Sequence, residues 1–164
     1  AASDVYKRQP ILLAQSAAGA FHETWPLVSP WIGAMGAFIA GSNTISNMMF
    51  SYFQWSTASQ IGLNTDLAAQ VVALQAIGGA AGNMISVHNV VAACAVVGLV
   101  NKEGYVIRKT LVAMTYYVVQ AGFLGMAVIF GGAIWWLLAV IWPILFLTVM
   151  SVTSKSAASK SSSI

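Results

Sequence analysis

The four residues Gly41-Ser42-Asn43-Thr44 decide how this chain folds, because they interrupt an otherwise apolar stretch. The flanking runs, Trp31–Ala40 and Ile45–Trp55, contain no charged residue. Irregular backbone at membrane depth is tolerated only where it is buried in protein or lines a cavity. The tetrapeptide therefore predicts a broken helical segment whose ends meet at a binding site.

The composition places this broken stretch in a membrane protein. Hydrophobic residues make up 59% of the chain and charged residues 7%, whereas soluble domains carry about 25% charged residues. The net charge of +3 is small, and the basic residues lie at the ends of apolar segments. This placement is typical of topology signals and argues against a nucleic-acid-binding patch.

A second group of small and polar residues interrupts the next apolar stretch, 67–100. Its glycines permit close backbone approach and a break in the helix. Gly78 and Gly82 also form a G-x-x-x-G pair, which in many membrane helices marks only a packing face. A break at a binding site is favoured by the polar residues that follow, which are Asn83, Ser86, His88 and Asn89.

The remaining apolar segments predict two further spans, 110–130 and 133–152. Together they hold roughly 40 residues, or ~60 Å of helix, against a hydrocarbon core of ~30 Å. The loop from Asn101 to Lys109 carries three basic residues and one acid. The positive-inside tendency places this loop in the cytoplasm and the loop 59–66 outside. Lys155 and Lys160 then lie on the cytoplasmic side as well.

With this orientation, residues 31–57 fit a re-entrant hairpin that enters the membrane from outside and returns there. Each limb would be about 15–18 Å long, which is half of the bilayer. The alternative is one full span with the tetrapeptide near its middle. That alternative places the basic loop outside, so the charge bias favours the hairpin.

The two interruptions together form the predicted anion site. Ser42, Asn43 or Thr44 can cap the helix that follows, and the positive dipole end of that helix suits a carboxylate. The same polar groups could instead pack between helices or help the chain to turn, and the pattern alone leaves both roles open. The predicted substrate-binding residues are Ser42, Asn43, Thr44, Asn47, Gln75, Gly79, Gly82, Asn83 and Asn89.

His88 is the only acidic or basic side chain between Asp66 and Lys102. An ionisable group inside a membrane segment is a functional candidate by default. Because imidazole changes its charge near neutral pH, His88 is the predicted proton-coupling residue. A neutral histidine that is hydrogen-bonded for structural reasons is the alternative.

Motifs for catalysis or metal binding are absent from the sequence. The chain contains no P-loop, no G-x-S-x-G, no H-E-x-x-H and only one cysteine, Cys94. We therefore expect no enzyme activity, no metal, no cofactor and no intrachain disulfide. The expected partners are a small substrate and the lipid bilayer.

Several blocks of sequence carry a resemblance to a known family. They are GAMGAFIAGSNTISNMMF at residues 33–50, VALQAIGGAAGNMI at 72–85 and VHNVVAA at 87–93. Glu103-Gly104 and Arg108–Leu111 continue the match. In this order the blocks resemble the L-lactate permease family of multi-spanning inner-membrane carriers, over roughly the region from Trp25 to Gly125.

The resemblance implies an all-α membrane protein that is the C-terminal part of an inverted-repeat secondary transporter. It implies symport of L-lactate with protons, and of related 2-hydroxy acids such as glycolate, across the bacterial inner membrane. The Ser-Asn-Thr tip is also similar to hairpin tips in the wider ion-transporter superfamily, where two hairpins hold an anion and a coupling ion. One such hairpin occurs here, so we expect the N-terminal half of the carrier to lie outside this chain. The alternatives are a sodium-coupled carboxylate symporter and a non-transporting scaffold subunit.

The predicted organisation has three parts. Residues 1–9 read as a non-native leader, because they resemble a translated sequencing adapter. Residues 10–152 form a partial transmembrane transport domain with a re-entrant hairpin, a broken helix and two spans. Residues 153–164 are rich in serine and lysine, and this composition predicts disorder.

Overall fold

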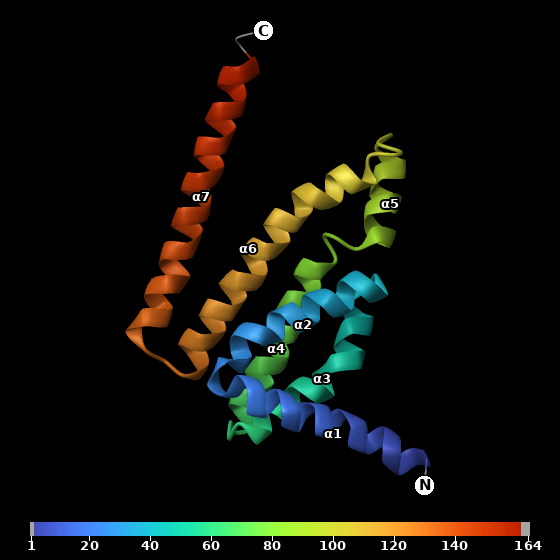
Figure 1. Cartoon of the computed structure of the whole chain (residues 1–164), viewed down its shortest axis with the longest axis vertical. Coiled ribbons are helices and arrows are strands. Elements are labelled where there is room, and N and C mark those ends of the chain that lie inside the picture. The colour runs from blue at the N-terminus through green and yellow to red at the C-terminus, as the bar shows by residue number, and fades with distance from the viewer. Residues whose placement is uncertain (1, 162–164) are drawn as a thin grey trace.

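The described elements of the chain are all helices (Figure 1). The computed structural model describes the backbone of residues 2–161 and the side chains of residues 11–153. The elements in order are α1 (Ala2–Phe21), the 3-10 helix η1 (His22–Thr24), α2 (Trp25–Ala40), α3 (Asn43–Gln60), α4 (Thr65–Gly82), α5 (Val87–Val96), α6 (Glu103–Ile129) and α7 (Ala133–Ser161). This architecture confirms the predicted fold class of an all-α membrane protein.

Helices α2 and α3 form a helical hairpin whose tip is Gly41-Ser42. Gly41 ends α2 with a φ of 70°, a left-handed conformation that favours glycine. The Ser42 hydroxyl accepts a hydrogen bond from the Ile45 N–H and caps α3. The chain therefore breaks within the predicted tetrapeptide.

The limbs of this hairpin are longer than the predicted range of 31–57. The prediction began the hairpin at residue 31, whereas α2 begins at Trp25, with Pro26 in its first turn. Proline fits the first turn of a helix because the N–H that it lacks would have no partner at that position. The limbs have 16 and 18 residues, or ~24 and ~27 Å. Insertion of the hairpin into a membrane from one side stays a prediction.

The predicted broken helix corresponds to α4 and α5. Helix α4 ends at Gly82, and the chain turns over residues 83–86 before α5 begins. The start of α4 is capped by Asn64, whose Oδ1 accepts the Leu67 N–H at 2.9 Å. The two helices together cover Thr65–Val96, which is long and apolar enough to cross a membrane.

Helices α6 and α7 are also long and apolar enough to cross a membrane. They lie side by side after a turn at Gly131 and Gly132 (Figure 1). Helix α6 begins at Glu103, so Arg108 and Lys109 are helical and do not lie in a loop. An acidic residue in the first turn stabilises a helix start through the helix dipole, which explains this early beginning.

The end of α7 differs from the composition-based expectation. The sequence predicts disorder from residue 153 onward, whereas the backbone of α7 is helical to Ser161. Residues 162–164 lie outside the described residues.

Helix α7 packs along α6, where Trp142 Nε1 donates to the Tyr116 carbonyl at 3.3 Å.

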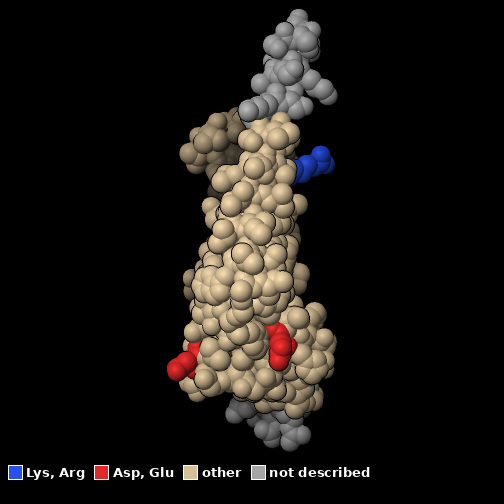
Figure 2. Space-filling model, turned by 90° about the vertical axis from the view of Figure 1, so that its left-hand side faces the viewer, with Lys and Arg blue, Asp and Glu red and all other residues tan. Residues whose placement is uncertain are grey.

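Charged side chains lie toward the two ends of the molecule. On the face shown in Figure 2, a basic side chain lies near one end and acidic side chains lie near the other. The surface between them carries no charge on this face. An uncharged band between charged ends is typical of a protein surface that contacts lipid.

The closest packing in the fold joins α2 to α4. A β-carbon at Gly33 would overlap the backbone of α4, and β-carbons at Gly78 and Gly82 would overlap the backbone of α2. Small residues allow membrane helices to approach in this way. The G-x-x-x-G pair of α4 is therefore a packing face, and it also leads into the break at Asn83.

Two apolar clusters fix the hairpin at its feet and near its tip. The first joins Trp25 and Ala58 of the hairpin to Val71 of α4 and to residues of α6. The second joins Ala34, close to the tip, to Met114 and other residues of α4 and α6. The hairpin is thus held against α4 and α6 along its length.

The close approach of α2 and α4 makes Gly78→Ala destabilising. The added methyl group would meet the Pro30 backbone, so the two helices must separate. Overpacking of this kind costs about 1–3 kcal/mol. We expect a lower melting temperature for the purified chain in detergent, measured as loss of the folded peak in size-exclusion chromatography after heating.

Gly104→Ala is the matched control for this prediction. Gly104 is also helical, and a β-carbon there would have no neighbour within 4 Å. This variant should melt at or above the wild-type temperature, because alanine favours helix over glycine. Equal melting of Gly78→Ala and wild type would contradict the close contact.

Candidate anion site at the hairpin tip

The tip of the hairpin lies against the break between α4 and α5. A β-carbon at Gly41 would lie 3.0 Å from Nδ1 of His88 and 3.5 Å from Oγ of Ser86. A β-carbon at Gly79 would overlap Oδ1 of Asn43. The two interruptions, which are distant in sequence, are therefore neighbours in space.

The N-termini of α3 and α5 lie beside each other at this point. Asn43 is the first residue of α3, and His88 is the second residue of α5. The first N–H groups of a helix have no partner within the helix and carry a partial positive charge. Ser86 precedes α5 but makes no side-chain cap hydrogen bond, so its hydroxyl leaves these N–H groups to other acceptors.

Buried polar atoms without a hydrogen-bond partner gather at the same place. Among the described residues they include Oδ1 of Asn43, Oδ1 of Asn83 and Oγ of Ser86. The Ser86 residue is fully buried. Most buried polar groups in proteins have a partner, so this cluster indicates a position for a polar ligand.

The other predicted residues lie around this cluster. Thr44 and Asn89 are exposed, and Nδ2 of Asn89 donates to the Asn83 carbonyl across the break at 3.4 Å. Asn47 is half-buried on α3, and its Oδ1 also lacks a partner among the described residues. Gly82 packs against Ala34 of α2 and not against the tip.

Gln75 lies deeper, in a buried hydrogen-bond network with Ser46 and Gln54, which are not among the predicted site residues. Its Nε2 donates to Oγ of Ser46 at 3.1 Å, and its Oε1 accepts from Nε2 of Gln54 at 3.0 Å. The Ser46 hydroxyl donates to the Gly33 carbonyl at 2.9 Å. The only sequence feature that could have identified Ser46 and Gln54 is that each is a polar residue within an apolar segment.

The groups available to a carboxylate at the tip are few. The sequence has no lysine or arginine between residues 9 and 101. His88 is exposed at the start of α5 and is the basic side chain beside the tip. An anion there would be held by backbone N–H groups, side-chain amides, hydroxyls and the imidazole.

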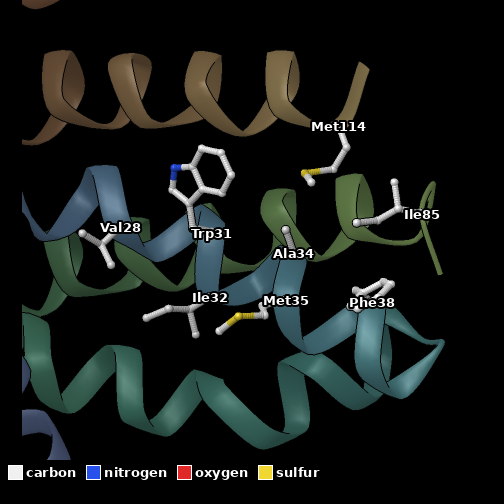
Figure 3. A pocket seen from close by; sticks show the side chains of 8 residues that line it. All are labelled: Val28, Trp31, Ile32, Ala34, Met35, Phe38, Ile85 and Met114. Atoms are coloured by element: carbon white, nitrogen blue, oxygen red, sulfur yellow. The ribbon is translucent and has the colours of Figure 1, made fainter. Parts of the chain in front are cut away.

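An apolar cavity of about 330 Å³ lies nearby, between α2 and α6 (Figure 3). Its lining residues are Val28, Trp31, Ile32, Ala34, Met35, Phe38, Ile85 and Met114. No charged or amide side chain lines it, so this cavity does not suit a carboxylate. The candidate site is therefore the contact between tip and break.

Comparison with known proteins identifies related sequences. The family model described as L-lactate permease matches residues 11–131. The L-lactate permease of Escherichia coli is 43% identical over 83 residues, which are 51% of this chain and 14% of that protein. The glycolate permease GlcA of Escherichia coli is 39% identical over 87 residues, or 53% of this chain and 15% of that protein. The L-lactate permease of Bacillus subtilis is 41% identical over 83 residues, which are 51% of this chain and 14% of that protein.

These matches cover only about a seventh of the length of each relative. No solved structure matches the chain. The described residues contain three segments of membrane length, which are α4 with α5, α6 and α7. Together with relatives named as permeases, they make the chain part of a multi-pass protein of the bacterial cell membrane. Because the family model matches most of its residues, the chain belongs to the L-lactate permease family.

Proposed function

We propose that the full-length carrier that contains this chain transports L-lactate and related 2-hydroxy acids, such as glycolate, together with protons. Relatives named as L-lactate and glycolate permeases support this class of substrate. The observation that carries the proposal is the meeting of two helix N-termini beside unpartnered buried polar atoms. Such a site suits one carboxylate.

Residues 9–101 of this chain offer the carboxylate no lysine or arginine. The N-termini of α3 and α5 supply N–H groups with partial positive charge. The Asn43 and Asn83 amides and the Ser86 hydroxyl lie beside these termini. Their Nδ2 groups and the hydroxyl can donate hydrogen bonds to the carboxylate, and the unpartnered Oδ1 atoms can accept one from the hydroxyl of a 2-hydroxy acid. Ser42, Thr44, Asn47, Gly79 and Asn89 complete the proposed binding region.

His88 couples the bound anion to a proton in this proposal. Its Nδ1 faces Gly41 of the tip, within the same contact. A carboxylate held beside His88 favours the protonated imidazole, because opposite charges at short distance stabilise each other. Binding of lactate therefore favours uptake of a proton by His88, and release of one favours release of the other.

The proposed mechanism is alternating access. The hairpin and the α4–α5 segment form a unit that carries the anion, and this unit moves against the N-terminal half of the carrier. Both feet of the hairpin pack at the start of α4, as a hairpin that enters and leaves from one membrane face requires. In this arrangement the tip reaches the membrane interior beside the break in the helix.

Uptake into proteoliposomes tests the proposal. The full-length carrier should accumulate labelled L-lactate when a pH gradient is imposed, with or without sodium. Accumulation that requires a sodium gradient would show that sodium, and not the proton, is the coupling ion. Absence of saturable uptake of lactate and glycolate would contradict the transport function.

Asn43→Ala in the full-length carrier should reduce L-lactate uptake roughly ten- to hundredfold. The variant removes an amide at the N-terminus of α3, and a hydrogen bond to a charged group is worth about 1.5–3 kcal/mol. Initial rates at several lactate concentrations measure the effect. Gln60→Ala is the control, because Gln60 is an exposed amide at the far end of the same helix. Normal kinetics of Asn43→Ala at equal membrane abundance would remove Asn43 from the site.

His88→Gln should abolish accumulation of lactate driven by a pH gradient while leaving exchange down a lactate gradient. Glutamine keeps a hydrogen-bonding side chain but cannot take up a proton. Accumulation and counterflow, measured in the same vesicles, separate the two activities. If the variant still accumulates lactate with normal pH dependence, the proton is carried by another group.

The orientation proposed here places residues 101–109 in the cytoplasm and residues 59–66 outside. Cysteines introduced at Asn101 and Asn64, in a Cys94→Ala background, should react differently with a membrane-impermeant thiol reagent on intact cells. Asn64→Cys should be labelled and Asn101→Cys protected. The reverse pattern would overturn both the orientation and the entry of the hairpin from outside.

A further inference from the structure

We infer that Gln54 and Gln75 are positioning residues that hold the hairpin tip in register with the break, and that Gln75 does not bind substrate. The inference rests on the proposed function, because it concerns the geometry of the proposed anion site. Together with Ser29 and Ser46, these two glutamines form what we call the buried amide clamp. All four residues are fully buried.

The buried amide clamp joins three helices in pairs. Ser29 of α2 donates to the Val71 carbonyl of α4 at 2.9 Å. Ser46 of α3 donates to the Gly33 carbonyl of α2 at 2.9 Å. The Gln54–Gln75 hydrogen bond of 3.0 Å then closes the triangle between α3 and α4.

The Gln75 amide is occupied within the protein. Its Nε2 donates to both Oγ and the carbonyl of Ser46, at 3.1 and 3.4 Å. Its Oε1 accepts from Gln54. The amide nitrogen and oxygen of Gln75 therefore both have partners on α3, and the residue is fully buried. This side chain is engaged within the protein and is not presented to a carboxylate.

The clamp lies one turn from the residues of the candidate site on both helices. Ser46 follows Asn43 by one turn of α3, and Gln75 precedes Gly79 by one turn of α4. Asn43 packs directly on Gly79. The hydrogen bond between Gln75 and Ser46 thus fixes the position of α3 along α4, and with it the place where the hairpin tip contacts the break.

Gln54 distinguishes positioning from substrate binding. It lies eleven residues beyond Asn43 on α3, or ~16 Å along the helix. A side chain at that distance from the tip cannot contact a small anion held there. An effect of Gln54 on transport must therefore act through the position of the hairpin.

The first measurement is lactate uptake by the full-length carrier with Gln54→Leu, Gln75→Leu or both changes. We expect about a tenfold loss for Gln54→Leu, because the substitution leaves Gln75 Oε1 buried without a donor. The double variant should lose no more than Gln75→Leu alone, since both changes remove the same hydrogen bond. Gln60→Leu, at an exposed position of α3, is the control and should transport normally.

The second measurement needs no transport. Ala37 lies near the tip and is fully buried, so a cysteine introduced there reports whether the hairpin stays closed on α4. In a Cys94→Ala carrier, Ala37→Cys should react slowly with N-ethylmaleimide, and Gln54→Leu should speed the reaction several-fold. The Gln60→Leu control should leave the rate unchanged.

Normal uptake and an unchanged labelling rate in Gln54→Leu would overturn the inference. So would a loss confined to Gln75→Leu, which a direct substrate contact predicts. If the leucine variants fail to reach the membrane, both measurements are made on Ser46→Ala. This variant removes the hydroxyl that joins Gly33 and Gln75 and changes the side-chain volume little. If the unmodified carrier transports neither lactate nor glycolate, the proposed function fails, and the labelling rates still decide the role of the clamp.

Discussion

Backbone contact between α2 and α4 is the constraint on which the rest of the structure depends. At Gly33, Gly78 and Gly82 there is no room for a β-carbon, so the two helices touch through their main chains. This short separation lets the Ser29 hydroxyl reach a carbonyl of the other helix. It also brings the hairpin close enough to α4 for the Asn43 side chain to contact Gly79. Helix association in a bilayer depends on such packing and on hydrogen bonds, because lipid is as apolar as the side chains.

The positions of the two breaks could be predicted from the sequence, since both follow from local chemistry. A glycine followed by a capping serine ends one helix and begins the next, and this pattern located the turn at Gly41-Ser42. The glycines and amides after Gln75 likewise located the break after Gly82. The start of α2 was harder to predict, because Trp25-Pro26 suits either a loop or the first turn of a helix.

The contacts between distant helices could not be predicted in the same way. A single glutamine within an apolar helix, such as Gln54, gives no information about which helix it faces. Gln75 was grouped with the substrate-binding candidates because it precedes the break by one turn, yet the partner of its amide lies on α3. The sequence marks Ser86 as a polar residue that can bind a ligand or cap the helix after the break, whereas its burial beside the hairpin tip is a tertiary feature. Spacing along one chain cannot supply such information.

Helix α7 shows how packing shapes the range of sequences that a fold accepts. Within the described residues only 6% of its most apolar window is buried, so few of its side chains must fit the shape of a neighbour in this part of the protein. Exchanges among leucine, isoleucine and valine there keep the hydropathy and disturb little else. The match to the family model ends at residue 131, two residues before α7 begins.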